Sequence, residues 1–133
     1  MRADTKTISI DAPAAEVMHF LADPSNLPRW AVGFAKSVRR ENDGWSVETT
    51  GGRMAIRIRA DEATGVVDFL MSPQPGVEIL AASRVVPRGR ACEYVFTQFQ
   101  SPGMPDEAFR KSVQALQHEL KVLKAIAEVE CPL

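Results

Sequence analysis

The sequence contains few of the residues that build metal centres or nucleic-acid interfaces. It has only 2 cysteines and 2 histidines, and these do not show the spacing of a zinc site. Its 16 Lys and Arg residues are balanced by 17 Asp and Glu, so the net charge of -1 leaves no basic excess for phosphate contacts. We therefore expect no metal site and no nucleic-acid partner.

Long apolar segments are also missing. No run approaches the ~18 apolar residues of a membrane span, and the opening segment MRADTKTISI lacks the apolar core of a signal peptide. These absences predict no stable membrane insertion and a cytoplasmic location, where Cys92 and Cys131 stay as free thiols. The dinucleotide glycine fingerprint, the P-loop and the nucleophile elbow are absent too, so no cofactor is implied. A length of 133 residues predicts one domain, residues 1–133.

The first 30 residues predict one strand followed by two short helices. Residues 5–10, TKTISI, alternate polar and apolar side chains, which is the pattern of a strand. Pro13 suits the first position of a helix whose apolar face carries Val17. The Asp-Pro pair at 23–24 ends this helix and begins a second one, which Pro28 keeps short.

The remainder predicts a meander of strands and one long helix. From Gly33 onward the pattern has period two, and turn sequences containing glycine separate six segments of strand length. With the first strand, this makes seven antiparallel strands. After Pro105, apolar residues recur every three or four positions, which predicts an amphipathic helix to about Glu130.

Charged residues indicate which face of each strand points inward, because an unpaired charge is costly to bury. The inward positions form a large, mostly apolar face with a few polar groups. Those polar groups are Thr49, Ser83, Tyr94, Gln98 and, if the strand after Phe34 has no bulge, Lys36. They either bond to one another and to water inside a packed core, or they orient a bound ligand.

Candidates for catalysis are few. His19 and His118 each lie off the apolar stripe of their helix, so both are expected in solvent. No carboxylate points inward on any strand. Tyr94 and, if the strand after Phe34 has no bulge, Lys36 therefore remain as the inward titratable candidates. Tyr94 could donate a proton to a carbonyl or a developing enolate, although a tyrosine that caps a buried carbonyl or water is the simpler explanation.

The order of elements, together with the segments ISIDAPAAEV and DPSNLPRW and the amphipathic C-terminal helix, resembles the helix-grip proteins. These form the START and pollen-allergen-like superfamily (SRPBCC), labelled polyketide cyclase/dehydrase and lipid transport. The resemblance covers nearly the whole chain. It implies an α+β fold in which a bent, seven-stranded antiparallel sheet wraps the long C-terminal helix. Two short helices between the first and second strands would close one end of the space between the sheet and the long helix.

The resemblance also implies a hydrophobic cavity between sheet and helix, and it implies which residues line that cavity. If the polar inward groups do orient a ligand, Ser83 and Gln98 belong to the same site, and by the resemblance Trp30 would be a packing residue. The apolar and aromatic lining implied for the sheet is Trp45, Met54, Ile56, Phe69, Ile79, Tyr94 and Phe96, and for the helix Phe109, Val113 and Leu116.

Three functions stay open from the sequence. The first is binding or carriage of a small hydrophobic molecule such as a lipid, a quinone or a polyketide-like compound. The second is a cyclase- or dehydratase-like enzyme that uses Tyr94. The third is a protein-interaction module with a packed interior, whose outer sheet face carries Arg53, Arg57 and Arg59. A row of solvated charges is the simpler explanation of those arginines, and a homodimer is compatible with any of the three.

Overall fold

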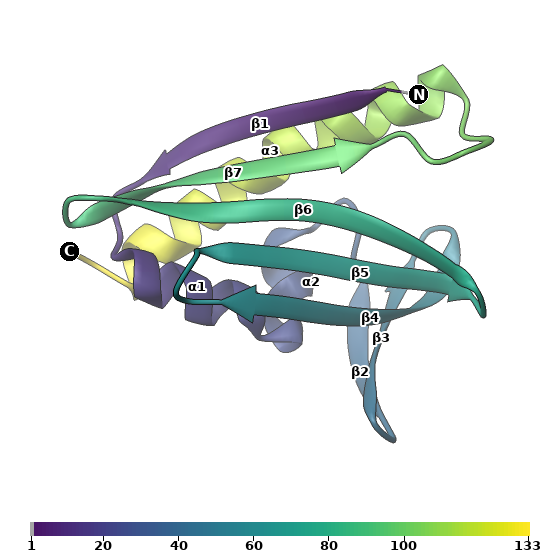
Figure 1. Ribbon diagram of the computed structural model, residues 1–133, viewed down its shortest axis with the longest axis horizontal. Coiled ribbons are helices and arrows are strands. Elements are labelled where there is room, and N and C mark those ends of the chain that lie inside the picture. The colour runs from purple at the N-terminus through teal and green to yellow at the C-terminus, as the bar shows by residue number, and fades with distance from the viewer. Residues whose placement is uncertain (1) are drawn as a thin grey trace.

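A computed structural model describes residues 2–133, which form one seven-stranded antiparallel sheet with helices over one face (Figure 1). The strands lie in the order β1-β7-β6-β5-β4-β3-β2. This arrangement confirms the predicted helix-grip fold. The strands are β1 (Ala3–Ile10), β2 (Ser37–Glu41), β3 (Gly44–Thr49), β4 (Gly52–Asp61), β5 (Val66–Gln74), β6 (Val77–Arg88) and β7 (Ala91–Phe99). The helices are α1 (Ala14–Ala22), a 3-10 turn (Pro24–Asn26), α2 (Leu27–Trp30) and α3 (Asp106–Glu130).

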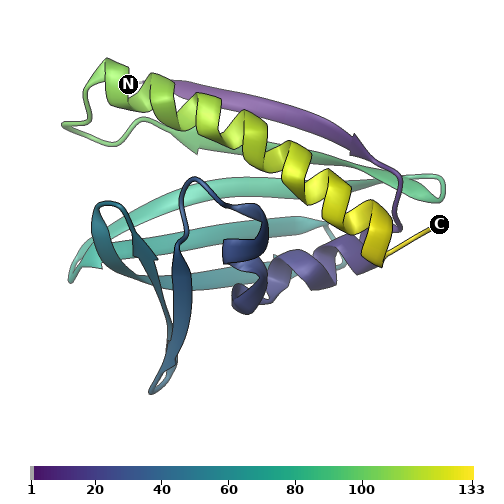
Figure 2. The same ribbon diagram turned by 180° about the vertical axis from the view of Figure 1, so that it is seen from behind.

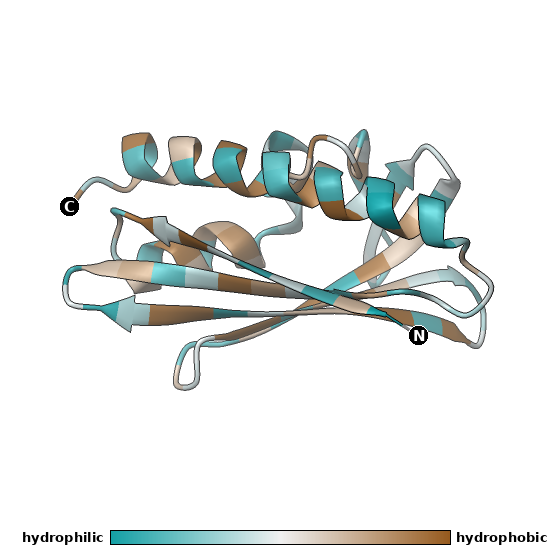
Figure 3. Ribbon diagram, turned by 90° about the horizontal axis from the view of Figure 1, so that it is seen from above, coloured by the Kyte–Doolittle hydropathy of each residue, from teal (hydrophilic) through white to brown (hydrophobic). Residues whose placement is uncertain are grey.

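The long helix α3 forms a layer over one face of the sheet, and its apolar residues face the strands (Figure 3). It begins directly after Pro105 and carries Asp106 and Glu107 in its first turn, where acidic side chains suit the helix dipole. No helix within residues 2–133 is long and apolar enough to cross a membrane.

The two ends of α3 meet different surroundings. Its C-terminal half lies beside α1 (Figure 2), and the buried residues Leu120, Leu123 and Ala127 join the central apolar cluster there. Arg29 of α2 also pairs with Glu130 near the end of α3. The N-terminal half of α3 instead runs along the β1–β7 edge of the sheet (Figure 2). At the opposite edge, β2 and β3 curve away from the direction of β1 and β7 (Figure 1).

On the outer face of the sheet, the arginine row of β4 pairs with acidic residues on β2, β5 and β6. Arg59 lies 3.2 Å from Asp68, and Arg57 lies 3.6 Å from Glu78. Arg53 lies 3.2 Å from Glu41. These arginines take part in exposed ion pairs, and each such pair contributes little to stability. This supports the simpler explanation of a solvated charge row.

Candidate functional site

A cavity of about 430 Å³ lies between the sheet and the N-terminal half of α3. This volume falls within the roughly 300–1,000 Å³ that is usual for small-molecule sites. Strands β4 to β7, the loops after α2 and β7, the β3–β4 turn and one face of α3 supply its wall. The lining residues are Leu27, Trp30, Ala31, Gly33, Phe34, Thr49, Thr50, Gly51, Met54, Ile56, Phe69, Met71, Ile79, Leu80, Ala81, Phe96, Gln98, Phe99, Ser101, Met104, Ser112, Ala115, Leu116 and Glu119.

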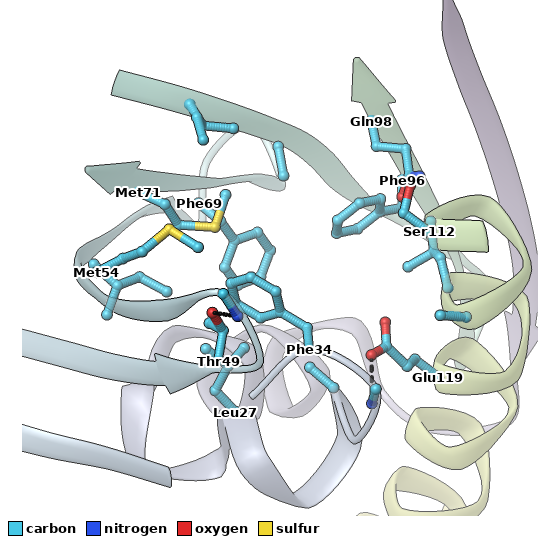
Figure 4. A pocket seen from close by; sticks show the side chains of 18 of the residues that line it. Leu27, Phe34, Thr49, Met54, Phe69, Met71, Phe96, Gln98, Ser112 and Glu119 are labelled. Carbon is cyan, nitrogen blue, oxygen red and sulfur yellow. Dashed lines mark hydrogen bonds between the residues drawn. The ribbon is translucent and has the colours of Figure 1, made fainter. Parts of the chain in front are cut away.

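The wall is mostly apolar and partly aromatic (Figure 4). The ring centroids of Phe69 and Phe96 are 6.0 Å apart, and that of Trp30 is 6.1 Å from Phe69. Met54 and Met71 add flexible thioethers, which adapt to irregular shapes and contact aromatic rings favourably. The arrangement suits a flat or ring-containing apolar molecule.

Small residues at key positions leave this space open. Ala81 on β6 lies opposite Phe69 on β5 and Gln98 on β7, so a small side chain sits between two strands that carry larger ones. On the facing helix, Ala115 lies near Gly33 of the α2–β2 loop. A larger residue at Ala81 would project into the cavity.

Most polar groups on the wall already bond to other protein groups. Gln98 Nε2 donates to Ser112 Oγ at 2.9 Å, and that hydroxyl donates to the carbonyl of Phe109 at 2.7 Å. Thr49 Oγ1 donates to the carbonyl of Gly52 at 2.8 Å. These side chains contribute fixed dipoles to an otherwise apolar surface.

Glu119 differs from them, because it is the ionisable side chain among the lining residues within 2–133. It is only 6% exposed, and its Oε2 accepts a hydrogen bond from the Gly33 N–H at 2.8 Å. Burial raises the pKa of this carboxyl, and the backbone N–H groups of Gly33 and Phe34 oppose part of that rise. Figure 4 shows the second carboxyl oxygen directed toward the open space.

The structure brings seven of the predicted lining residues to the cavity wall and leaves five away from it. Those at the wall are Met54, Ile56, Phe69, Ile79, Phe96, Gln98 and Leu116. Whether they contact a ligand stays a prediction. Those away from the wall are Trp45, Ser83, Tyr94, Phe109 and Val113.

Trp45 points to the predicted side of the sheet but lies in the β2–β3 hairpin. The guanidinium of Arg40 lies 5.8 Å from the centre of its ring. Phe109 and Val113 lie in the first turns of α3, and Phe109 is buried. Ser112 between them supplies the side chain that reaches the cavity.

From the sequence, Lys36 faces inward only if the strand after Phe34 has no bulge. It is exposed and lies just before β2, so it supplies no charge to the interior. His19 and His118 are exposed as expected, and His19 Nε2 lies 2.5 Å from Glu62 Oε1. Cys92 and Cys131 are free, as predicted.

Tyr94 and Ser83 form a buried pair within the core. The Tyr94 hydroxyl donates to Ser83 Oγ at 2.9 Å, and Ser83 donates to the carbonyl of Val67 at 2.5 Å. Tyr94 is 0% exposed, and burial raises the pKa of its hydroxyl far above its usual value. The hydroxyl therefore helps to satisfy a buried chain of polar groups.

The Tyr94→Phe variant is expected to unfold with a free energy lower by about 1 kcal/mol, the usual net value of a neutral hydrogen bond. Ser83 keeps its bond to the Val67 carbonyl, so the loss stays small. Urea denaturation measures this change, and ligand affinity is expected to stay at the wild-type value. A normally stable variant that loses ligand binding would assign Tyr94 to the site instead.

The sequence contains a pattern that could have identified Glu119 as a residue of the cavity wall. It lies three residues after Leu116 and directly before Leu120, so a carboxylate interrupts the apolar stripe of the helix. The sequence left the direction of Phe34 open, and the structure places it at the cavity wall in the loop before β2.

Comparisons with known proteins agree with this architecture. The aromatase/cyclase di-domain protein BexL shares 21% identity and a TM-score of 0.73, with the match covering 94% of this chain but only 46% of BexL. XoxI from Bacillus cereus shares 15% identity and a TM-score of 0.74 over 96% of both chains. A START superfamily protein from Mycobacterium smegmatis shares 19% identity and a TM-score of 0.66, over 95% of this chain and 97% of that one. At these identities, the similarities show the fold alone.

No curated protein matches the sequence. The comparison with protein families does give a match, and it extends over residues 1–128. The chain belongs to the polyketide cyclase / dehydrase and lipid transport family.

Proposed function

We propose that the protein binds or carries a small hydrophobic molecule between its sheet and α3. The observation that carries this proposal is the cavity of about 430 Å³ with a mostly apolar wall. Transfer of apolar surface from water into such a space is favourable by roughly 25 cal/mol per Å². A ring-containing ligand such as a quinone or a polyketide-like compound suits the aromatic wall, and a lipid chain suits the methionines.

The opening of the cavity supports entry of a ligand from solvent. Thr50 and Gly51 of the β3–β4 turn are exposed, and the lining residue Phe99 is 42% exposed. A ligand could therefore reach the buried rings without separation of the sheet from α3. We further expect a cytoplasmic location, in which Cys92 and Cys131 would stay reduced.

Two other functions receive less support. An interaction module with a packed interior would not need an open cavity, and the outer arginines already have acidic partners. A cyclase- or dehydratase-like enzyme based on Tyr94 would need that hydroxyl at the cavity wall, whereas it bonds to Ser83 in the core. An enzymatic function would rest more naturally on Glu119.

The Ala81→Leu variant tests the proposal, because the longer side chain projects into the cavity from β6. Calorimetric titration with 2-ethylnaphthalene is expected to show saturable binding to the wild type and at least about tenfold weaker binding to the variant. The apolar probe carries no polar group, so it reports on the cavity alone.

Ala82→Leu serves as the matched control. Ala82 is the next residue on β6 and faces the opposite side of the sheet, where Asp68 and Thr97 are its neighbours. This variant is expected to bind the probe as the wild type does. Equal binding by both variants would place the probe outside the cavity and refute the proposal for this ligand class.

A further inference from the structure

The cavity holds one carboxyl group in a fixed position. Glu119 Oε2 accepts the Gly33 N–H at 2.8 Å, which anchors the end of a long side chain. A Cβ atom at Gly33 would lie 3.2 Å from that oxygen and 3.3 Å from the Ala115 Cβ. The absence of a side chain at Gly33 therefore lets the α2–β2 loop approach the carboxyl closely.

Among the residues that the structure describes, no cation lies at the cavity wall to balance a negative charge on this carboxyl. Within residues 2–133, no Lys, Arg or His lines the cavity. On its own helix, the neighbouring His118 and Lys121 are exposed, and on the α2–β2 loop Lys36 is exposed. Arg29 of α2 pairs with Glu130, while β7 presents Phe96 and Gln98 to the cavity. Burial without a countercharge favours the neutral acid.

The position of the proton follows from the hydrogen bond to Gly33. Oε2 must act as an acceptor to satisfy that N–H, so in the neutral acid the proton belongs on the other oxygen. That oxygen points into the cavity in Figure 4. The site therefore presents one O–H donor to whatever occupies the space, beside the rings of Phe34 and Phe96.

We propose that Glu119 recognises the ligand by donating a hydrogen bond from its neutral carboxylic acid to a carbonyl oxygen. The ligand class is then an aryl ketone or a quinone, with its ring against the aromatic wall and its carbonyl toward α3. This inference rests on the proposed function of the cavity and adds the polar group by which it selects its ligand. A hydrocarbon of the same shape leaves the donor unpaired, and a buried unpaired donor weakens binding.

The test compares 2-acetylnaphthalene with 2-ethylnaphthalene, which differ in having a carbonyl or a methylene at the same position. Calorimetric titration of the wild type is expected to show roughly tenfold tighter binding of the ketone. In the Glu119→Leu variant the ratio of the two affinities is expected to fall to about one. The hydrocarbon titration in that variant also reports whether the cavity is still formed.

The Glu119→Gln variant separates a hydrogen-bond donor from a charge. Its amide oxygen can accept the Gly33 N–H, which directs the amide N–H group into the cavity. The ketone preference is therefore expected to survive in this variant. In the wild type, the ketone preference is expected to fall as the pH rises through the raised pKa of Glu119, because the donor is lost above it. The Gln variant should show no such dependence.

The outcomes are distinguishable. Equal affinities of the wild type for ketone and hydrocarbon would overturn the role of Glu119 and leave the apolar cavity intact. Failure of both probes to bind would remove the proposed function together with this inference. Tighter binding of 2-naphthylmethylamine than of the ketone, lost in Glu119→Gln, would show an ion pair with a carboxylate and would also overturn the proposal.

Discussion

Replacement of Gly65 with alanine is expected to lower the free energy of unfolding by about 4 kcal/mol, within the range of severe single substitutions. Gly65 has a φ angle of +81°, which strains any residue with a side chain. A Cβ atom there would lie 2.2 Å from the Val85 carbonyl oxygen. The Gly65 carbonyl also accepts the Val85 N–H at 2.8 Å, so relief of the clash would break a contact between the β4–β5 turn and β6.

Gly76→Ala is the matched control, because Gly76 has a φ angle of +83° with no heavy atom within 4 Å of the added Cβ. It carries the same backbone strain without the clash, so a loss of about 1 kcal/mol is expected. Urea denaturation of both variants measures the difference. Equal losses would show that the approach of the β4–β5 turn to Val85 is looser than described.

The second large effect concerns the two halves of α3. Leu123→Ala is expected to lower the free energy of unfolding by about 4 kcal/mol, and Leu116→Ala by about 2 kcal/mol. Leu123 is 0% exposed and packs in the central cluster beside Ala127, so its truncation creates a new void. Leu116 is 3% exposed but lines the existing cavity, so it has fewer contacts to lose.

The two variants carry the same leucine-to-alanine change at positions about two turns apart on the same helix. Denaturant unfolding of both variants at the same pH gives the two losses directly. A larger loss for Leu116→Ala than for Leu123→Ala would mean that the N-terminal half of α3 is the tightly packed one. That result would contradict a cavity beneath it.

Much of the fold could be predicted from the sequence, because local rules and the global fold agree. Turn sequences containing glycine separated the strands, and the charges of Arg57 and Arg59 correctly phased β4 so that Ile56 points inward. Pro28 marked the short helix α2, and Pro105 marked the start of α3. Each of these signals acts within a few residues of its effect.

The site could be predicted only in part, because alternation gives the face of a strand and not the position along it. Tyr94 and Phe96 lie on the same face of β7, yet only Phe96 reaches the cavity. Trp45 similarly shares a face with Thr49, which does line the cavity. The position of α3 and of the α2–β2 loop over the sheet decides which residues of the inner face line the cavity.

Glu119 illustrates a different limit. Charges were assumed to point outward, which holds for most charged residues but not for one whose carboxyl group has a hydrogen-bond partner in the fold. That partner is the backbone N–H of Gly33, which is 86 positions away along the chain. Only the tertiary fold brings the α2–β2 loop to α3.

A crystal structure of the protein with 2-ethylnaphthalene tests the central claim most directly. The account predicts density for the two fused rings between α3 and the sheet, in contact with Phe69, Phe96 and Met54. A crystal in which neighbouring side chains such as Phe34 fill that space, with the probe absent or bound elsewhere, would contradict it.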